Sequence, residues 1–247
     1  MPKRASAGTA LTFVVALCAL TLVVTQNADA RLAISIYLGG SQTTPSNLRV
    51  VQPSRGNDAT LRRVPWLAYP FRFEPYYGIR LTWIPPGHAW ARLALDYTHY
   101  KTYANTTNEV EQSGTWHGAP FQTTGPMNER VQSFEMTHGL NMAGLTIVHV
   151  FSAGDNGVYA GIGPVIYVPH SENTVDGSRV NAHFNFGGFG FQVVGGASTC
   201  IGNSQVFVEL KYNDGHPQVS IADGYAQTPV HTVHELAGVT LGGRCRR

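Results

Sequence analysis

Histidines that lie close to carboxylates are the residues of this sequence best suited to acid–base or metal chemistry. Three such pairs stand out: Asp96 with His99, Glu135 with His138, and His170 with Glu172. Imidazole and carboxylate groups exchange protons in catalysis, and both types bind iron, copper and manganese. Whether the two members of a pair can act together depends on the element that carries them.

The elements that carry these pairs are predicted to be β-strands, because apolar and polar residues alternate along them. Clear examples are residues 92–98 and 205–212. Such alternation sends the two sets of side chains to opposite faces of a strand. The third pair, whose members are two positions apart, therefore shares a face. The members of the other two pairs are three apart and lie on opposite faces unless a bulge intervenes.

Eight segments with this pattern can be laid out along the chain, at about 31–41, 73–84, 89–102, 133–150, 158–170, 187–199, 204–214 and 230–243. Short connections alternate with long ones, which cover about 42–72, 103–132, 171–186 and 215–229. Short turns at one end and long loops at the other are typical of outer-membrane barrels. The sequence therefore predicts an all-β fold, an eight-stranded antiparallel up-and-down transmembrane β-barrel. A closed barrel satisfies all its backbone hydrogen bonds within lipid.

The polar set of alternate positions in these strands carries charges of both signs, such as Glu74, Arg80, Arg92 and Asp96. Inside a narrow barrel these charges can pair, whereas lipid would not tolerate them. We therefore expect the side chains at the other, apolar positions to face lipid. A soluble periplasmic β-sandwich or lipocalin-like barrel would alternate equally well and is the alternative. A porin is disfavoured, because eight strands enclose side chains rather than a water channel.

The first thirty residues are predicted to be a secretory signal peptide. Lys3 and Arg4 precede an apolar run, and Ala28-Asp29-Ala30 is a small-x-small cleavage site. Cleavage would leave a barrel domain of residues 31–247 in a bacterial outer membrane; an uncleaved N-terminal anchor is the alternative. The 17 basic and 15 acidic residues nearly balance, so nucleic acid is not an expected partner. We expect a monomer.

Two cysteines, Cys200 and Cys245, remain after the signal peptide. Export places them in an oxidising compartment, where a disulfide persists. The predicted topology brings the turn at 200–204 and the C-terminus to the same periplasmic end, which makes a bridge between them sterically reasonable. Two unpaired thiols are the alternative. The chain lacks the terminal aromatic residue on which outer-membrane barrels usually end.

Several short stretches go beyond general barrel character. They are PYYGIRLTW at 75–83, LDYTHYK at 95–101, FEMTHGLN at 134–141, and YAGIGPV at 159–165, which runs into VPH at 168–170. Their order and spacing resemble the small outer-membrane β-barrel family that includes rhizobial lipid A oxidase, most firmly over about 73–170. The resemblance implies oxygen-dependent oxidation of the proximal glucosamine of lipid A to an aminogluconate unit, with peroxide as by-product. Lipid A, within lipopolysaccharide, would then be the partner.

Such an oxidation needs a base for the sugar hydroxyl and an acceptor for the electrons. The glycine run at 187–190 is not followed by helical periodicity, so no flavin or nicotinamide is expected. A divalent or redox metal ion is the expected cofactor, with His170 as a ligand and Glu172 as a second ligand or base. The other two histidine–carboxylate pairs would lie around the same rim. The basic residues expected near the lipid A phosphates are Arg72, Lys101, Arg130 and Arg179.

A non-enzymatic interpretation stands beside this one. Histidines at the rim of a barrel can simply be solvated or bind lipid headgroups. The protein would then be a surface barrel that stabilises the envelope or binds host or matrix ligands through its long loops.

Overall fold

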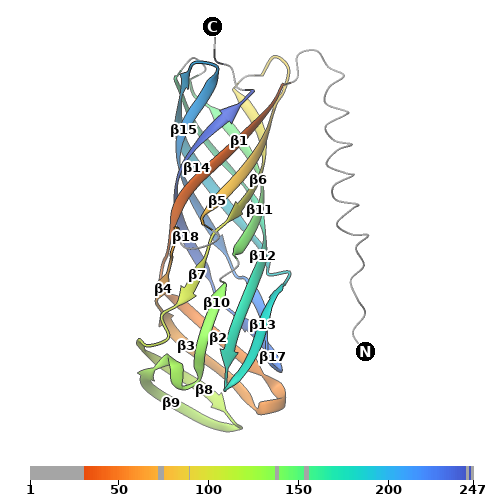
Figure 1. Ribbon diagram of the computed structural model, residues 1–247. Helices are drawn as coiled ribbons and strands as arrows, with labels where there is room; N and C mark the ends of the chain where they lie inside the picture. Colours follow the sequence, from red (N-terminus) through yellow and green to blue (C-terminus); the bar gives the residue numbers. More distant parts are fainter. Residues whose placement is uncertain are drawn as a thin grey trace.

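The computed structural model describes residues 31–71, 75–88, 90–136, 139–152, 156–242 and 245. The predicted signal peptide lies outside these residues. Within them the fold is an all-β barrel closed by antiparallel strands (Figure 1). No helix in the described part of the chain is long and apolar enough to span a membrane.

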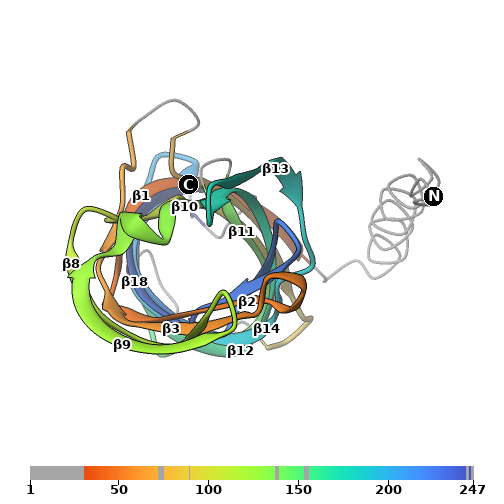
Figure 2. The same cartoon turned by 90° about the horizontal axis from the view of Figure 1, so that it is seen from below.

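Eight strands form the barrel, and each pairs with the next along the chain. They are β1 (Arg31–Thr43), β5 (Tyr77–Ile84), β6 (Ala91–His99), β11 (Leu140–Val150), β12 (Asn156–Val175), β14 (Gly188–Ile201), β15 (Ser204–Gly215) and β18 (Val230–Leu241). Pairing of β1 with β18 closes the ring, which is seen end-on in Figure 2. The predicted fold class is confirmed, and with it the alternation of short and long connections.

One predicted strand, 133–150, is divided in two. Its first part belongs to β10 (Val131–Met136), which pairs with β12 and with β7 (Thr102–Ala104). Its second part is the barrel strand β11, which pairs with β6 and β12. Gly139, between them, has a φ of +105°, a conformation that side chains rarely adopt. Hydrophobic alternation continues across this glycine, so the pattern alone did not show the break.

The long connections, predicted as loops, are themselves mostly strands. Beyond the barrel they form a cap, drawn at the lower end of Figure 1. One sheet of the cap has the order β16-β17-β2-β3-β8-β9. Its strands are β2 (Ser46–Gln52), β3 (Asn57–Val64), β8 (Glu109–Trp116), β9 (Ala119–Pro126), β16 (Gln218–Ile221) and β17 (Gly224–Gln227), while β4 (Trp66–Leu67), β7, β10 and β13 (Ser178–Phe184) extend the barrel wall. The 3-10 turns Pro53–Arg55 and Met127–Glu129 complete it.

The outward face of the barrel is apolar, as the alternation predicts. Ile36, Ile79 and Leu210 are 59%, 51% and 60% exposed. Aromatic residues lie towards both ends of the wall, with Trp90 and Phe151 near the short turns and Tyr77, Tyr97 and Phe189 near the cap. A closed barrel with this exterior is built to cross a bacterial outer membrane, where the end with long connections faces outside the cell.

The barrel lumen is filled by an ionic network. The guanidinium of Arg80 donates to both carboxylate oxygens of Glu209 at 2.7 Å and to Asp96 Oδ2 at 2.7 and 2.9 Å. Lys211 Nζ donates to the same Asp96 oxygen at 3.1 Å, and Tyr159 donates to Glu209 at 2.9 Å. All four charged groups are buried. The prediction that opposite charges pair inside the barrel is confirmed for Arg80 and Asp96, and Glu209 is a second partner of Arg80. Glu74 lies outside the described residues.

Between this network and the cap the interior becomes hydrophobic. Leu48, Leu61, Met127 and Val131 are completely buried and belong to one cluster that continues from the lumen into the cap. The cap is therefore packed around a core and does not consist of free loops. At its far end the guanidinium of Arg55 donates to Asp223 Oδ2 at 2.9 Å and to Asp176, tying together three hairpin tips.

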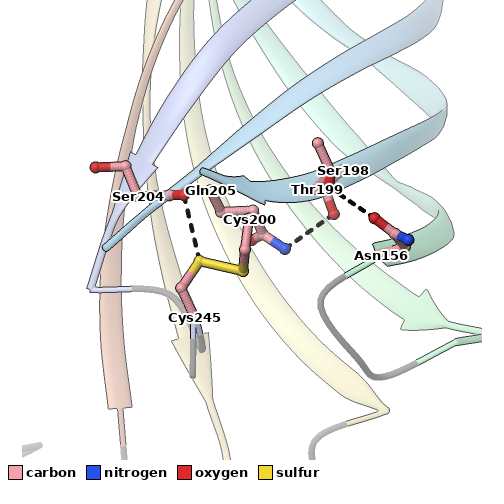
Figure 3. Close-up of a disulfide and its surroundings, with 7 residues drawn as sticks. All are labelled: Asn156, Ser198, Thr199, Cys200, Ser204, Gln205 and Cys245. Carbon is pink, nitrogen blue, oxygen red and sulfur yellow. Dashed lines mark hydrogen bonds between the residues drawn. A yellow bond between two sulfur atoms is a disulfide. The ribbon is translucent and has the colours of Figure 1, made fainter. Parts of the chain in front are cut away.

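At the opposite end of the barrel, Cys200 and Cys245 form a disulfide with a Cα–Cα distance of 5.5 Å (Figure 3). The bridge joins the end of β14 to the segment that follows β18. Beside it Gln205 donates to Ser198 Oγ at 2.9 Å, and Thr199 donates to Asn156 at 2.6 Å.

Candidate functional site

Four polar and aromatic side chains gather on the outward wall of β5, β6 and β11, at the level where the apolar band ends. The ring of Tyr77 stacks on His99 at a centroid distance of 4.9 Å, and Tyr77 and His99 are directly paired between β5 and β6. His99 Nδ1 lies 2.9 Å from Asn141 Oδ1, and the Tyr97 hydroxyl donates to the same oxygen at 2.7 Å. We call Tyr77, Tyr97, His99 and Asn141 the wall cluster.

The hydrogen bonds of Asn141 determine the tautomer of His99. Asn141 Nδ2 donates to the backbone carbonyls of Gly139 and Val168 at 3.3 and 3.2 Å. Its Oδ1 is therefore the acceptor, and His99 Nδ1 must carry the hydrogen. The neutral imidazole then has its lone pair at Nε2. This nitrogen is buried and has no hydrogen-bond partner among the described residues. It is the free basic atom of the wall cluster.

Gly139 allows the imidazole to lie where it does. A Cβ at this position would overlap the His99 ring and the Asn141 side chain, and the φ of +105° already disfavours any other residue. His170 N donates to the Gly139 carbonyl at 2.9 Å. The glycine therefore links the wall cluster to β12.

The site residues predicted from the sequence are partly brought together. Glu135 and Glu172 are directly paired between β10 and β12, on the cap side of the wall cluster. The ring of His170 stacks on Phe184 at 4.3 Å, and Glu172 is ion-paired with Arg179. His138 and Arg72 lie outside the described residues.

Other predicted site residues lie apart from this wall. Asp96 points into the lumen and is held by Arg80 and Lys211, as its opposite parity to His99 requires. Arg130 lies in the cap, where its guanidinium is 4.4 Å from the ring of Phe121. Lys101 follows His99 along the chain and is 9% exposed. Asp96 therefore cannot act on the same substrate group as His99.

Tyr77, Tyr97 and Asn141 were not among the site residues predicted from the sequence. All three occur in the stretches that carry the family resemblance, which was the available signal. They have no carboxylate or basic group, so a search for histidine–carboxylate pairs did not find them.

The predicted metal ligands do not form a metal site as they stand. Glu172 is ion-paired, His170 is stacked, and no group of three His, Cys, Asp or Glu side chains in the described part of the chain could hold a metal ion. The metal ion therefore remains a prediction.

No protein-family model matches the chain, and no curated protein does. Solved structures with a similar fold include neisserial surface protein A, with 13% identity, a TM-score of 0.42 and coverage of 87% of this chain and 98% of that one. OprG from Pseudomonas aeruginosa has 9% identity, a TM-score of 0.46 and coverage of 88% and 99%. The outer-membrane protease OmpT from Escherichia coli has 11% identity, a TM-score of 0.44 and coverage of 89% and 100%.

Proposed function

We propose that the protein modifies lipopolysaccharide by oxygen-dependent oxidation of the proximal glucosamine of lipid A to an aminogluconate unit, at the wall cluster. The observation that carries the proposal is the position of His99. Its free Nε2 belongs to a side chain on the membrane-facing side of the barrel, at the level of the outer-leaflet headgroups. The Nε2 atom itself is buried, so the side chains that cover it would have to move before a lipid sugar could contact it.

The chemistry needs a base at the anomeric hydroxyl. Nε2 of His99 would accept the hydroxyl proton while the C1 hydride and its electron pair pass to O2. The hydroperoxide then takes this proton from His99, which gives the lactone and hydrogen peroxide and restores the base. Water then opens the lactone to the aminogluconate. Asn141 fixes the ring through Nδ1, and Tyr77 supports one ring face. These contacts provide the orientation that general base catalysis requires.

Two further observations support the site. Tyr77, Tyr97, His99 and Asn141 come from three of the stretches that resemble the lipid A oxidase family. Arg179, which is exposed and ion-paired with Glu172, lies on the cap side of the cluster, and guanidinium groups bind phosphate. The expected metal ion would have to be held near His170 and Glu172, with a further ligand from outside the described residues.

The test is the mass of lipid A from a host that lacks the modification and whose lipid A has a free anomeric hydroxyl on the proximal glucosamine. Expression of the full chain is expected to add one oxygen atom to lipid A and to release peroxide. An unchanged lipid A mass, with a folded barrel in the outer membrane, would contradict the proposal.

A non-enzymatic structural or adhesive role is the second candidate. It is favoured by the cap, which has a hydrophobic core and presents β9 as the edge strand of its sheet. An unmodified lipid A together with ligand binding that is lost when the cap is removed would favour this role.

A further inference from the structure

β9 forms an open edge of the cap sheet. It is the terminal strand of that sheet, and its partner among the described strands is β8. The opposite edge, β16, is covered by the segment 185–187. Gln218 N donates to the Gly187 carbonyl at 2.9 Å, and Ser220 N donates to Asn185 Oδ1 at 3.3 Å. No described residue covers β9 in this way. Figure 1 shows β9 at the outermost end of the cap, away from the barrel.

The turn before β9 determines which of its backbone groups point to the open edge. His117 and Gly118 have φ values of +52° and +78°, so a two-residue type I′ turn joins β8 to β9. The residues that flank such a turn exchange two backbone hydrogen bonds, and so does every second pair beyond them. The β9 residues that bond to β8 are therefore Ala119, Phe121, Thr123 and Gly125.

The remaining β9 residues direct their backbone groups to the open edge. Gln122 and Thr124 each present an N–H and a carbonyl there, whereas Pro120 and Pro126 have no N–H. Prolines on an edge strand hinder the addition of a long strand. What is left is a short window between two prolines, centred on Thr123.

This window is symmetric about Thr123. The prolines lie three positions before and after it, and the two outward N–H groups lie one position before and after it. An antiparallel second copy with Thr123 facing Thr123 would pair Gln122 of each copy with Thr124 of the other. Each outward N–H would then meet an outward carbonyl. A threonine facing a threonine is also a favourable cross-strand pair.

The same register places Phe121 of each copy opposite Gly125 of the other. A glycine inside a strand weakens it, and here neither the backbone nor the space requires one. Gly125 does not have a positive φ, and a Cβ added to it would meet no atom within 4 Å of this chain. An aromatic side chain facing a glycine across two strands covers it. The glycine thus leaves room for the phenyl ring of a second copy.

The position of β9 determines where that copy comes from. The twofold axis that relates two antiparallel strands is perpendicular to their sheet. Figure 2 shows that the cap sheet follows the outline of the barrel wall, so this axis runs roughly parallel to the membrane plane. The second barrel then lies beyond the cap, in a facing membrane. One short contact is weak, but many copies on two facing cells act together.

We propose that β9 pairs with β9 of a second copy in a facing outer membrane, antiparallel and centred on Thr123. This contact goes beyond lipid A oxidation and does not depend on it. It gives the adhesive role a specific partner, a second copy of this chain.

The first test is docking between two populations of phospholipid vesicles that carry the full-length barrel, one with a donor and one with an acceptor fluorophore on its lipids. We expect energy transfer between the wild-type populations, and Thr124→Pro should reduce it at least about tenfold, because proline removes an outward N–H. This N–H points away from β8, so the cap sheet stays intact. Thr124→Ala is the matched control, which keeps the N–H and should still dock.

The second test is cross-linking by mild oxidation, with Cys200 and Cys245 already bridged. In Thr123→Cys the two new cysteines would face each other with Cα atoms about 4.5 Å apart, within reach of a disulfide. In Gln122→Cys they would be diagonal neighbours at about 7–8 Å, beyond that reach. Thr123→Cys should therefore link the two vesicle populations at least about tenfold faster than Gln122→Cys.

Equal cross-linking of the two cysteine variants, or docking that survives Thr124→Pro, would overturn the proposal. Docking of wild-type vesicles onto protein-free vesicles would also overturn it and indicate a lipid partner. Absence of docking by the wild type would overturn it as well and assign to the prolines the role of keeping this edge unpaired. Resistance to denaturation by detergent without heating shows that each variant is folded.

Discussion

His99 Nδ1 lies 2.9 Å from Asn141 Oδ1, on the outside of a barrel whose inside carries Asp96 only three residues earlier in the chain. One strand thus serves two purposes. Its inward residues take part in the ionic network that fills the lumen, and its outward residues form the wall cluster. The separation follows from strand alternation and places His99 on the membrane-facing wall, with its Nε2 buried beneath neighbouring side chains.

Asn141→Leu should lower the rate of lipid A oxidation about tenfold, because it removes the acceptor that orients the His99 ring, a loss of about 1.4 kcal/mol. The effect should fall on kcat more than on KM, since Asn141 positions the base and does not bind the lipid. Asn156→Leu is the matched control, an amide that accepts a hydrogen bond from Thr199 at the far end of the barrel. Equal losses in the two variants would exclude the orienting role.

Arg80→Met should destabilise the barrel by about 3–5 kcal/mol, because it leaves the carboxylates of Asp96 and Glu209 buried without their main partner. Unfolding in guanidinium, followed by the loss of β-sheet circular dichroism, measures the change. Arg49→Met removes a pair with Asp58 in which both side chains are 49% exposed, and it should cost about 0–1 kcal/mol. A smaller loss for Arg80→Met than for Arg49→Met would contradict the structure of the lumen.

Cys245→Ser should lower the free energy of unfolding by about 4 kcal/mol or less, since the disulfide closes a loop with a sequence separation of 45 residues. Reduction of the wild-type protein should give the same loss, and reductant should have no further effect on the variant. An unfolding midpoint that neither change moves would show that the bridge does not constrain the barrel.

The cap should loosen in acid through Asp176. Burial raises the pKa of this carboxyl, but hydrogen bonds from His117 and Arg55 outweigh burial and hold the pKa below its usual value of 3.8. A lowered folded-state pKa gives stability that is complete above the unfolded value and is lost as the pH falls through the folded one. The protection of the cap-strand amides, measured as exchange rates relative to the intrinsic rates at each pH, should therefore be constant from pH 7 to about 4 and fall below that.

Asp176→Asn should remove this acid step. Asp58→Asn, at an exposed pair with Arg49 in the same cap, serves as its control and should retain the step. An acid step of full size in Asp176→Asn would assign it to another group.

The barrel was predictable because its signal is local. Alternation placed Arg80, Asp96 and Glu209 on one face, and the spacing of the short turns gave the order of the strands. Phe207 is an apolar residue at a polar position of the alternation, because it is a lumen residue that packs edge-on against Tyr37 at a centroid distance of 6.4 Å.

The cap and the wall cluster were not predictable in this way. Cap strands β3 and β8 pair across more than fifty residues, and no turn joins them, because each forms its hairpin with another strand, β3 with β2 and β8 with β9. The contact between His99 and Asn141 depends on the register of β6 against β11. This register could not be predicted, because the break at Gly139 divides the segment that was predicted as one strand. Histidine–carboxylate spacing therefore found His99 but paired it with Asp96, which lies on the other side of the wall.

The most direct test of lipid A oxidation at the wall cluster compares two histidines on the same outward wall. His99 lies near the cap, and His149 lies near the short turns, where it contacts Trp90. The wild type, His99→Ala and His149→Ala would each be expressed in a host that lacks the modification, and each barrel would be shown to be folded. The mass of lipid A would then be measured by mass spectrometry. We predict that the wild type and His149→Ala add one oxygen atom, whereas His99→Ala slows the reaction about 100- to 10,000-fold. Full modification by His99→Ala, or none by the wild type, would contradict the account.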